Sequence, residues 1–378
     1  MTSIVSNLLA SDKETLILRS WKPTVPVVAT VTFIHGIGEH SGRYEHVFSK
    51  FAENGILVNA FDQRGHGKSG GTRGHSPSLE QSLKDITLIA SNADPALPHF
   101  IYGHSFGGCL ALHYTLKNQE RAPAGCVVTS PLIKPAFKVS GFKLFLGNLL
   151  GKVAATSTID SNLNASHISK DAEVVATYKK DVLVHSKISL GLGRWMLSKA
   201  ESLLDEAPKY TSPVLLIHGN DDKITCPKAS QQFFDRIAST DKTLKLWEDM
   251  YHEVHNEKDQ DLVIQFIIDW IILRVAGPVN NQVIVVPTVT VETGAEPAAA
   301  TSTTTTSVVV SVEETKPAEA SEVVVVVPVV SVETTTKAPA AATEQKEEKA
   351  PAAAAPAKQE QQQQQPKKKN NKKGKKKN

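Results

Sequence analysis

The stretch Gly103-His104-Ser105-Phe106-Gly107 has the residue types and spacing of a nucleophile elbow. In such an elbow a serine lies on a sharp turn between a strand and a helix, and its Oγ projects above a sheet. Glycine is needed at both ends because a side chain would collide across the turn and because glycine tolerates strained backbone angles. The flanks agree, since residues 98–102 are predicted as a buried strand and residues 109–116 as a helix. Ser105 is therefore the predicted nucleophile of an acyl transfer.

A serine nucleophile also needs a general base and a carboxylate that orients the base, in the chain order Ser, Asp, His. The predicted strand 212–219 is followed by Asp221 and Asp222, of which we favour Asp222 as the orienting carboxylate. The loop after the last predicted strand carries His252 and His255. We favour His252 as the base because it stands closer to that strand. An imidazole suits this role because its ordinary pKa of about 6.5 lets it accept and donate a proton near neutral pH.

The oxyanion of such a reaction needs backbone donors. The predicted strand 27–34 leads directly into the glycine-bearing loop His35-Gly36-Ile37-Gly38. In hydrolases with an elbow, a loop of this kind supplies one N–H, and the residue after the nucleophile supplies the other. We assign these donors to Ile37 and Phe106, with a simple turn as the alternative for the loop. His66, in the next loop along, is interpreted as a hydrogen-bonded support.

Composition divides the chain into a folded body and a tail. No aromatic residue follows Trp270, and from Gly277 onward there is no Leu, Phe or Met, so this segment cannot bury a core. We predict one domain over residues 1–276 and a disordered, low-complexity tail over 277–378 that ends in a Lys-rich cluster. The tail carries 13 Lys and 11 Glu, which is +2 of the chain's formal +3, so the body is not a basic nucleic-acid surface. The lysine cluster fits an anionic lipid, RNA or a solvated end, and we favour the solvated end.

Strands and helices alternate along the body, which predicts an α/β fold with a mostly parallel sheet flanked by helices. The alternation lapses between Pro131 and Pro208, where an insertion of about 132–208 after the sixth strand has the right size for a helical cap. Within it, apolar residues recur at helical spacing over 139–153, with lysines around them. Contact with a lipid surface and packing onto the body explain this pattern equally well.

Cysteine usage and the lack of targeting signals predict the compartment. The three cysteines Cys109, Cys126 and Cys226 lie in or beside predicted core elements, which favours a reducing compartment over a disulfide framework. The first residues lack a signal-peptide pattern, and no apolar run reaches the roughly 18 residues of a membrane span. We expect a soluble cytoplasmic protein that meets membranes or lipid droplets only at their surface. No metal or other cofactor is expected, because the thiols lack ligand spacing and no G-x-G-x-x-G or P-loop motif occurs.

Several segments together resemble the monoacylglycerol lipase family, a serine aminopeptidase S33-like group of α/β-hydrolases that includes lysophospholipases. The resemblance covers about residues 12–275 and rests on residues 35–44, the elbow at 103–108, Ile159-Asp160-Ser161, and residues 241–245 before Tyr251-His252. It implies an α/β-hydrolase fold with a lid, and cleavage of monoacylglycerol to fatty acid and glycerol. The cap is only loosely similar, and the tail has no counterpart in the family pattern.

By this resemblance, site residues can be carried over position by position. Ser105, Asp222 and His252 fall on the family's triad, and Ile37 and Phe106 fall on its oxyanion hole. The positions near the glycerol end of the family's pocket are occupied here by Glu39, Arg43, Tyr178 and His255.

Three functions remain open on the sequence. The first is hydrolysis of monoacylglycerol through an acyl-enzyme. The second is a lysophospholipase, another carboxylesterase or an acyltransferase with the same triad. The third is a catalytically silent binding module with the basic tail as its working part. The presence of Ser105, Asp222 and His252 weighs against the third, since a scaffold needs none of them.

Overall fold

The computed structural model describes residues 3–137 and 154–275. The predicted helix over 139–153 and the tail from residue 277 lie outside these described residues. One sheet has eight strands: β1 (Ile4–Leu9), β2 (Thr15–Trp21), β3 (Ala29–Ile34), β4 (Ile56–Asp62), β5 (His99–His104), β6 (Gly125–Thr129), β9 (Val214–Gly219) and β10 (Lys242–Trp247). The helices of the body are α1 (Glu45–Glu53), α2 (Leu79–Ala90), α3 (Phe106–Lys117), α7 (Pro227–Arg236) and α8 (Gln260–Val275).

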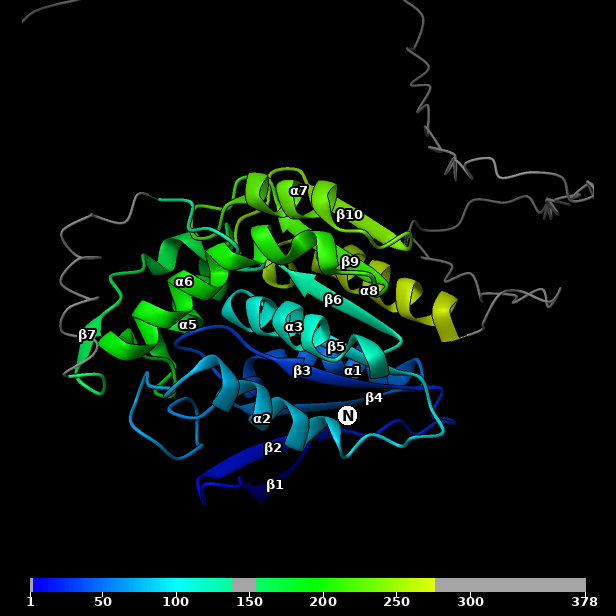
Figure 1. Ribbon diagram of the computed structural model, residues 1–378, viewed down its shortest axis with the longest axis horizontal. Helices are drawn as coiled ribbons and strands as arrows, with labels where there is room; N and C mark the ends of the chain where they lie inside the picture. Colours follow the sequence, from blue (N-terminus) through cyan, green and yellow to red (C-terminus); the bar gives the residue numbers. More distant parts are fainter. Residues whose placement is uncertain (1–2, 138–153, 276–378) are drawn as a thin grey trace, which may run out of the picture. The chain divides into compact units, whose positions relative to one another are not determined.

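The strand order is β1-β2-β4-β3-β5-β6-β9-β10, and Figure 1 shows most of these strands side by side. β2 pairs antiparallel with β1 and β4, whereas every other pair is parallel. Parallel strands covered on both faces read as continuous apolar runs, and β3, β6 and β9 are buried along their whole length. Because parallel strands share one carboxyl edge, the loops that follow β3, β5, β9 and β10 meet there.

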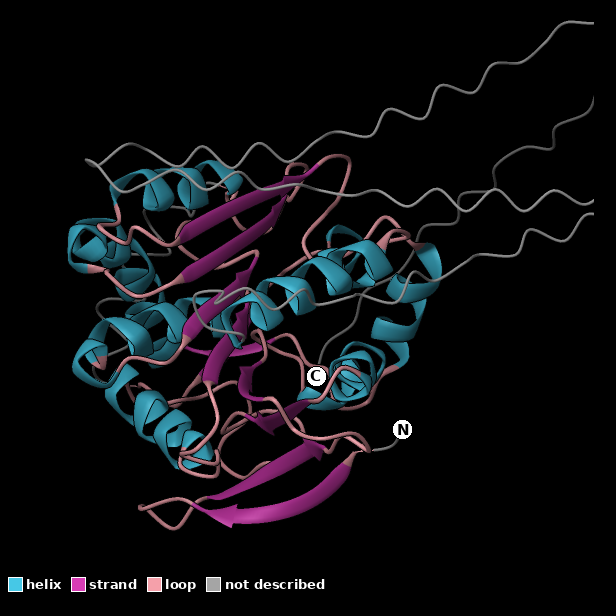
Figure 2. Ribbon diagram, turned by 90° about the vertical axis from the view of Figure 1, so that its right-hand side faces the viewer, coloured by secondary structure: helices cyan, strands magenta, loops and turns pink. Residues whose placement is uncertain are grey.

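Helices cover both faces of the sheet, as Figure 2 shows. Successive strand side chains point to opposite faces, so Phe100 and Tyr102 of β5 pack with α1 and α8, whereas Ile101 packs with α2, α3 and α7. The two faces therefore bury two separate hydrophobic clusters. The predicted α/β-hydrolase fold is confirmed by this sheet.

The cap lies between β6 and β9 in the chain. Its described elements are β7 (Thr158–Asp160), α5 (Ala172–Lys180), β8 (Lys187–Ser189) and α6 (Leu190–Glu206). β7 and β8 form a small antiparallel sheet, and Figure 1 shows β7 and α5 at one end of the large sheet. Leu192 and Leu203 of α6 join the core cluster of α2 and α3, while α5 has no fully buried residue. Within the two described ranges, no helix combines the length and apolar character needed to cross a membrane.

Candidate active site

The turn between β5 and α3 holds Ser105 in a strained conformation. Its φ is +55° and its ψ is −119°, a backbone conformation that residues other than glycine rarely adopt. A Cβ on Gly103 would lie 2.3 Å from the carbonyl oxygen of Gly107, and a Cβ on Gly107 would lie 2.1 Å from that of Ile34. Both glycines are thus required for the helix to start this close to the sheet, and the strained turn presents the Ser105 hydroxyl at its carboxyl edge.

Three side chains from three loops form a continuous chain of hydrogen bonds. His252 Nδ1 lies 2.7 Å from Asp222 Oδ2, and its Nε2 lies 2.9 Å from Ser105 Oγ. A carboxylate can only accept, so Nδ1 carries the ring proton and Nε2 is left to accept the proton of the Ser105 hydroxyl. All three residues are buried. The arrangement can therefore activate a serine for nucleophilic attack.

Asp222 is oriented by its own turn. Its Oδ1 accepts hydrogen bonds from the N–H of Ile224 at 2.7 Å and of Thr225 at 3.1 Å, which leaves Oδ2 facing His252. Burial raises the pKa of Asp222, but the charge of His252 and the side-chain hydrogen bonds from His218 and His252 outweigh it and hold the pKa well below its ordinary value. The rival Asp221 points away and pairs at 2.9 Å with Lys170 Nζ on the surface.

Sequence reasoning missed a second histidine on the same carboxylate. His218 is fully buried at the end of β9, and its Nε2 lies 3.0 Å from Asp222 Oδ2. Because Nε2 must donate to that oxygen, Nδ1 accepts from Ser230 Oγ at 2.8 Å. His218 and His252 therefore both hold the same oxygen of the carboxylate. The position of His218 four residues before Asp222 was the available signal.

The two predicted oxyanion donors, Ile37 and Phe106, belong to segments that border Ser105. Phe106 is the first residue of α3, so its N–H has no partner within the helix. Ile37 lines a cavity of about 40 Å³ together with Ser105 and His252. The loop that carries Ile37 is fixed by Glu39, whose Oε1 accepts from the Gly36 N–H at 2.6 Å.

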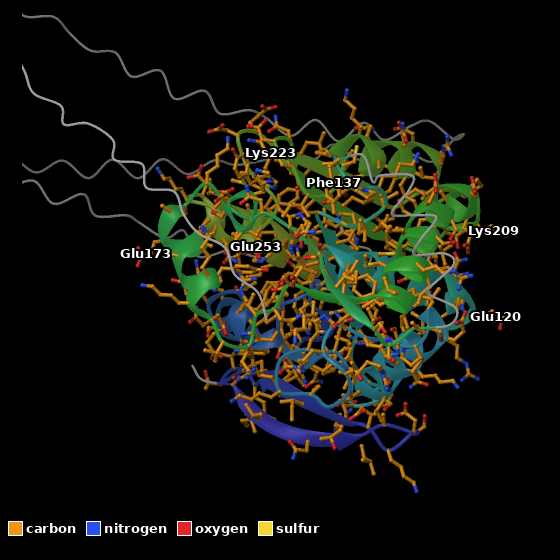
Figure 3. All side chains as sticks on the ribbon, turned by 90° about the vertical axis from the view of Figure 1, so that its left-hand side faces the viewer. Glu120, Phe137, Glu173, Lys209, Lys223 and Glu253 are labelled. Atoms are coloured by element: carbon orange, nitrogen blue, oxygen red, sulfur yellow. The ribbon has the colours of Figure 1, made fainter. Side chains whose placement is uncertain are left out.

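A buried ionic cluster, consisting of Glu39, Arg43 and Glu253, lies beside this cavity. Arg43 Nη1 donates to Glu39 Oε2 at 2.7 Å, and its two terminal nitrogens bind Glu253 in a bidentate pair at 2.7 Å each. Figure 3 shows Glu253 well inward of the exposed Glu173 on α5. Burial raises the pKa of Glu253, but the guanidinium outweighs it and lowers the pKa to about 2. Sequence reasoning did not single out Glu253, because its partner is 210 residues away in the chain.

Of the predicted substrate contacts, Glu39 and Tyr178 line the cavity beside Ser105, whereas His255 does not. Tyr178 and Glu39 line the cavity with Ser105, and the Arg43 guanidinium lies 4.7 Å from the Tyr178 ring centroid. His255 lines neither of the two cavities described here and is fully buried, with its ring 4.8 Å from that of His104. Burial lowers the pKa of His255 to about 3, so the ring is neutral. A role of His255 at the glycerol end of the substrate stays a prediction.

A second, larger cavity of about 210 Å³ adjoins the first. The two share the lining residues Ile37, Leu163, Ala165 and Tyr178. Much of the rest of its wall comes from the cap segment between α5 and β8. In this segment the N–H of His185 donates to the Gly38 carbonyl at 2.8 Å. The space next to Ser105 thus continues beneath the cap.

The pH dependence of catalysis follows from the surroundings of His252. Burial lowers the pKa of its ring, but Asp222, with smaller contributions from Glu253 and Glu39, raises the pKa above the ordinary value. Below that pKa the ring is protonated and cannot accept the Ser105 proton. We therefore expect kcat/KM to fall on the acid side with a midpoint above pH of about 6.5, measured on a soluble ester. A midpoint below that value would show that burial outweighs the carboxylates.

Comparison with known proteins identifies the family. The sequence model of the serine aminopeptidase S33 family matches residues 26–259. The monoacylglycerol lipase of Mycolicibacterium smegmatis is 38% identical over 256 residues, which are 67% of this chain and 91% of that protein. The chain belongs to the monoacylglycerol lipase-like group of this family.

Two further relatives extend the comparison. The crystal structure of the monoacylglycerol lipase of Paleococcus ferrophilus has a TM-score of 0.65 and 31% identity, covering 68% of this chain and 99% of that one. An uncharacterized abhydrolase domain-containing protein of Dictyostelium discoideum is 66% identical over 283 residues, or 75% of this chain. The chain spans 30% of the length of that relative. The resemblance inferred from the sequence motifs is thus confirmed.

Proposed function

We propose that this protein is a carboxylic ester hydrolase that cleaves monoacylglycerols to fatty acid and glycerol. The observation that carries the proposal is the hydrogen-bonded chain from Ser105 through His252 to Asp222, with 2.9 Å between Ser105 Oγ and His252 Nε2. The names of the Mycolicibacterium and Paleococcus relatives support the choice of substrate.

The reaction proceeds in two halves. Ser105 Oγ attacks the ester carbonyl while His252 Nε2 takes its proton, and Asp222 stabilises the imidazolium. The N–H groups of Ile37 and Phe106 stabilise the oxyanion, each by about 3 kcal/mol. The imidazolium then protonates the departing glycerol oxygen. In the second half His252 takes a proton from water, the hydroxide attacks the acyl-enzyme, and Ser105 regains its proton as the fatty acid leaves.

The glycerol end of the substrate lies against the ionic cluster in this proposal. Glu39 and Tyr178 share the cavity with Ser105 and offer a carboxylate and a phenol to alcohol hydroxyls. Arg43 holds Glu39 in place at 2.7 Å. His255 contributes by packing against His104.

Rival functions differ in the leaving group or in the acceptor. A lysophospholipase, another carboxylesterase or an acyltransferase would use the same triad, while a silent binding module would need none of it. The deciding experiment is release of glycerol and fatty acid from monoacylglycerol by the purified protein, together with labelling of Ser105 by a fluorophosphonate. Labelling without glycerol release would favour another ester, and a folded protein that stays unlabelled would favour the binding module.

Contact with a lipid surface is a finer proposal, carried by the sequence of residues 139–153 and of the tail. A terminal lysine cluster is attracted to anionic lipid by roughly 1 kcal/mol per charge. Deleting residues 277–378 is expected to leave turnover of a soluble ester unchanged and to weaken binding to vesicles that contain phosphatidylserine. Unchanged vesicle binding would favour a solvated tail or RNA, and a large loss of turnover would show that the domain extends beyond residue 276.

A further inference from the structure

One buried carboxylate, that of Glu257, joins the cap to the loop that carries His252. Glu257 is only 4% exposed. Its Oε1 accepts hydrogen bonds from the N–H of Tyr251 at 2.8 Å and of Lys170 at 3.1 Å. Its Oε2 accepts from the N–H of Lys170 at 3.0 Å and from Ser169 Oγ at 3.1 Å. Both oxygens therefore accept hydrogen bonds from uncharged donors. Bonds of this kind to a carboxylate are stronger than those between two neutral groups.

These donors belong to two different parts of the site. Tyr251 immediately precedes His252. Ser169 and Lys170 immediately follow Ile168, a cap residue that lines the cavity beside Ser105. The segment is tied a second time, because the Glu253 N–H donates to the Ile168 carbonyl at 2.7 Å. His252 is therefore held on its two sides, by the Tyr251 bond to Glu257 and by the Glu253 bond to the cap.

We propose that Glu257 is a positioning residue that sets His252 against Ser105 and couples this alignment to the cap. A substrate that contacts Ile168 contacts a cap segment that is hydrogen-bonded to Glu257. The same carboxylate is hydrogen-bonded to the loop that carries His252. The inference rests on the proposed serine hydrolase chemistry but not on the glycerol head group. It can therefore be tested with any ester that acylates Ser105.

The Glu257→Gln variant tests the proposal because an amide keeps the shape and loses one acceptor. Its NH₂ group must face either Tyr251 or the cap donors, so one of these two links breaks. Glu173→Gln is the matched control, since Glu173 is an exposed residue of cap helix α5. Both variants are made in the full chain and assayed on p-nitrophenyl acetate and on monooleoylglycerol, and the active fraction is counted by fluorophosphonate labelling.

We expect Glu257→Gln to lower kcat per labelled site by about 10- to 100-fold on both esters, because a displacement of the base by 1 Å or less costs this much. KM for p-nitrophenyl acetate stays within about twofold, and Glu173→Gln matches the wild type. A kcat per labelled site equal to that of the wild type would overturn the proposal, even if the melting temperature falls. A wild type that hydrolyses p-nitrophenyl acetate but not monooleoylglycerol would refute the proposed substrate. The test of Glu257 on p-nitrophenyl acetate would still stand.

A second variant keeps the proposal testable if Glu257→Gln does not fold. Ser169→Ala removes a cap-side hydroxyl that lies 3.1 Å from Glu257 Oε2 and 3.0 Å from the Asn256 carbonyl, and it leaves the carboxylate and the Tyr251 bond in place. We expect it to raise KM for monooleoylglycerol at least about threefold, while p-nitrophenyl acetate, too small to depend on the cap, is unaffected. Equal effects on the two substrates, or none on either, would contradict the coupling.

Discussion

Replacing Ser105 by alanine is expected to lower kcat for ester hydrolysis by at least about a thousandfold. The substitution removes only the Oγ that lies 2.9 Å from His252 Nε2. The elbow itself is set by Gly103 and Gly107, so its geometry is retained. What remains is the catalysis that an oxyanion hole and substrate binding supply without a nucleophile.

The measurement compares kcat of Ser105→Ala and of Ser91→Ala with the wild type on a soluble ester. Ser91 is exposed after α2, and its hydroxyl bonds only to the Leu88 carbonyl among the bonds described for it, so its loss controls for removing a hydroxyl. Circular dichroism and the melting temperature show that each variant is folded. Activity of folded Ser105→Ala above about one hundredth of the wild type would mean that another nucleophile does the chemistry.

The elbow could be predicted from the sequence because it is local. A strand, a turn and a helix follow one another within residues 98–117, and each is specified by its own residues. Helix α2 is equally local, since Ser78 caps its first turn by accepting from the Gln81 N–H. Such elements can be predicted from short-range sequence patterns because their own residues specify them.

Contacts between distant loops were beyond the reach of sequence patterns. Arg43 and Glu39 are four residues apart, but Glu253 completes their cluster from the other end of the domain. His255 shows the same limit. Resemblance assigns it to the glycerol end of the pocket, but no sequence pattern indicates its packing, in which the short helix η5 (Val254–Asn256) buries its ring against Tyr44 and His104.

The second large expected effect on kcat distinguishes Asp222 from the adjacent Asp221. Asp222→Asn is expected to lower kcat about ten-thousandfold, because the amide reverses the tautomer of the base. Oδ1 of residue 222 must still accept from the N–H of Ile224 and Thr225, so the new NH₂ group occupies the place of Oδ2. There it faces the Nδ1–H of His252, and donor meets donor. The ring relieves this by moving its proton to Nε2, which can then no longer accept from Ser105.

Asp221→Asn is the matched control. Its ion pair with Lys170 lies on the surface, where such pairs stabilise a protein by less than about 1 kcal/mol, so we expect kcat within about threefold of the wild type. Residual activity of Asp222→Asn supplies an independent check. Without the charge that raises the pKa of His252, the acid limb of kcat/KM moves to lower pH. A larger loss of kcat in Asp221→Asn than in Asp222→Asn would show that Asp221 is the orienting carboxylate. An acid limb that stays in place in Asp222→Asn would show that Asp222 does not raise the pKa of His252.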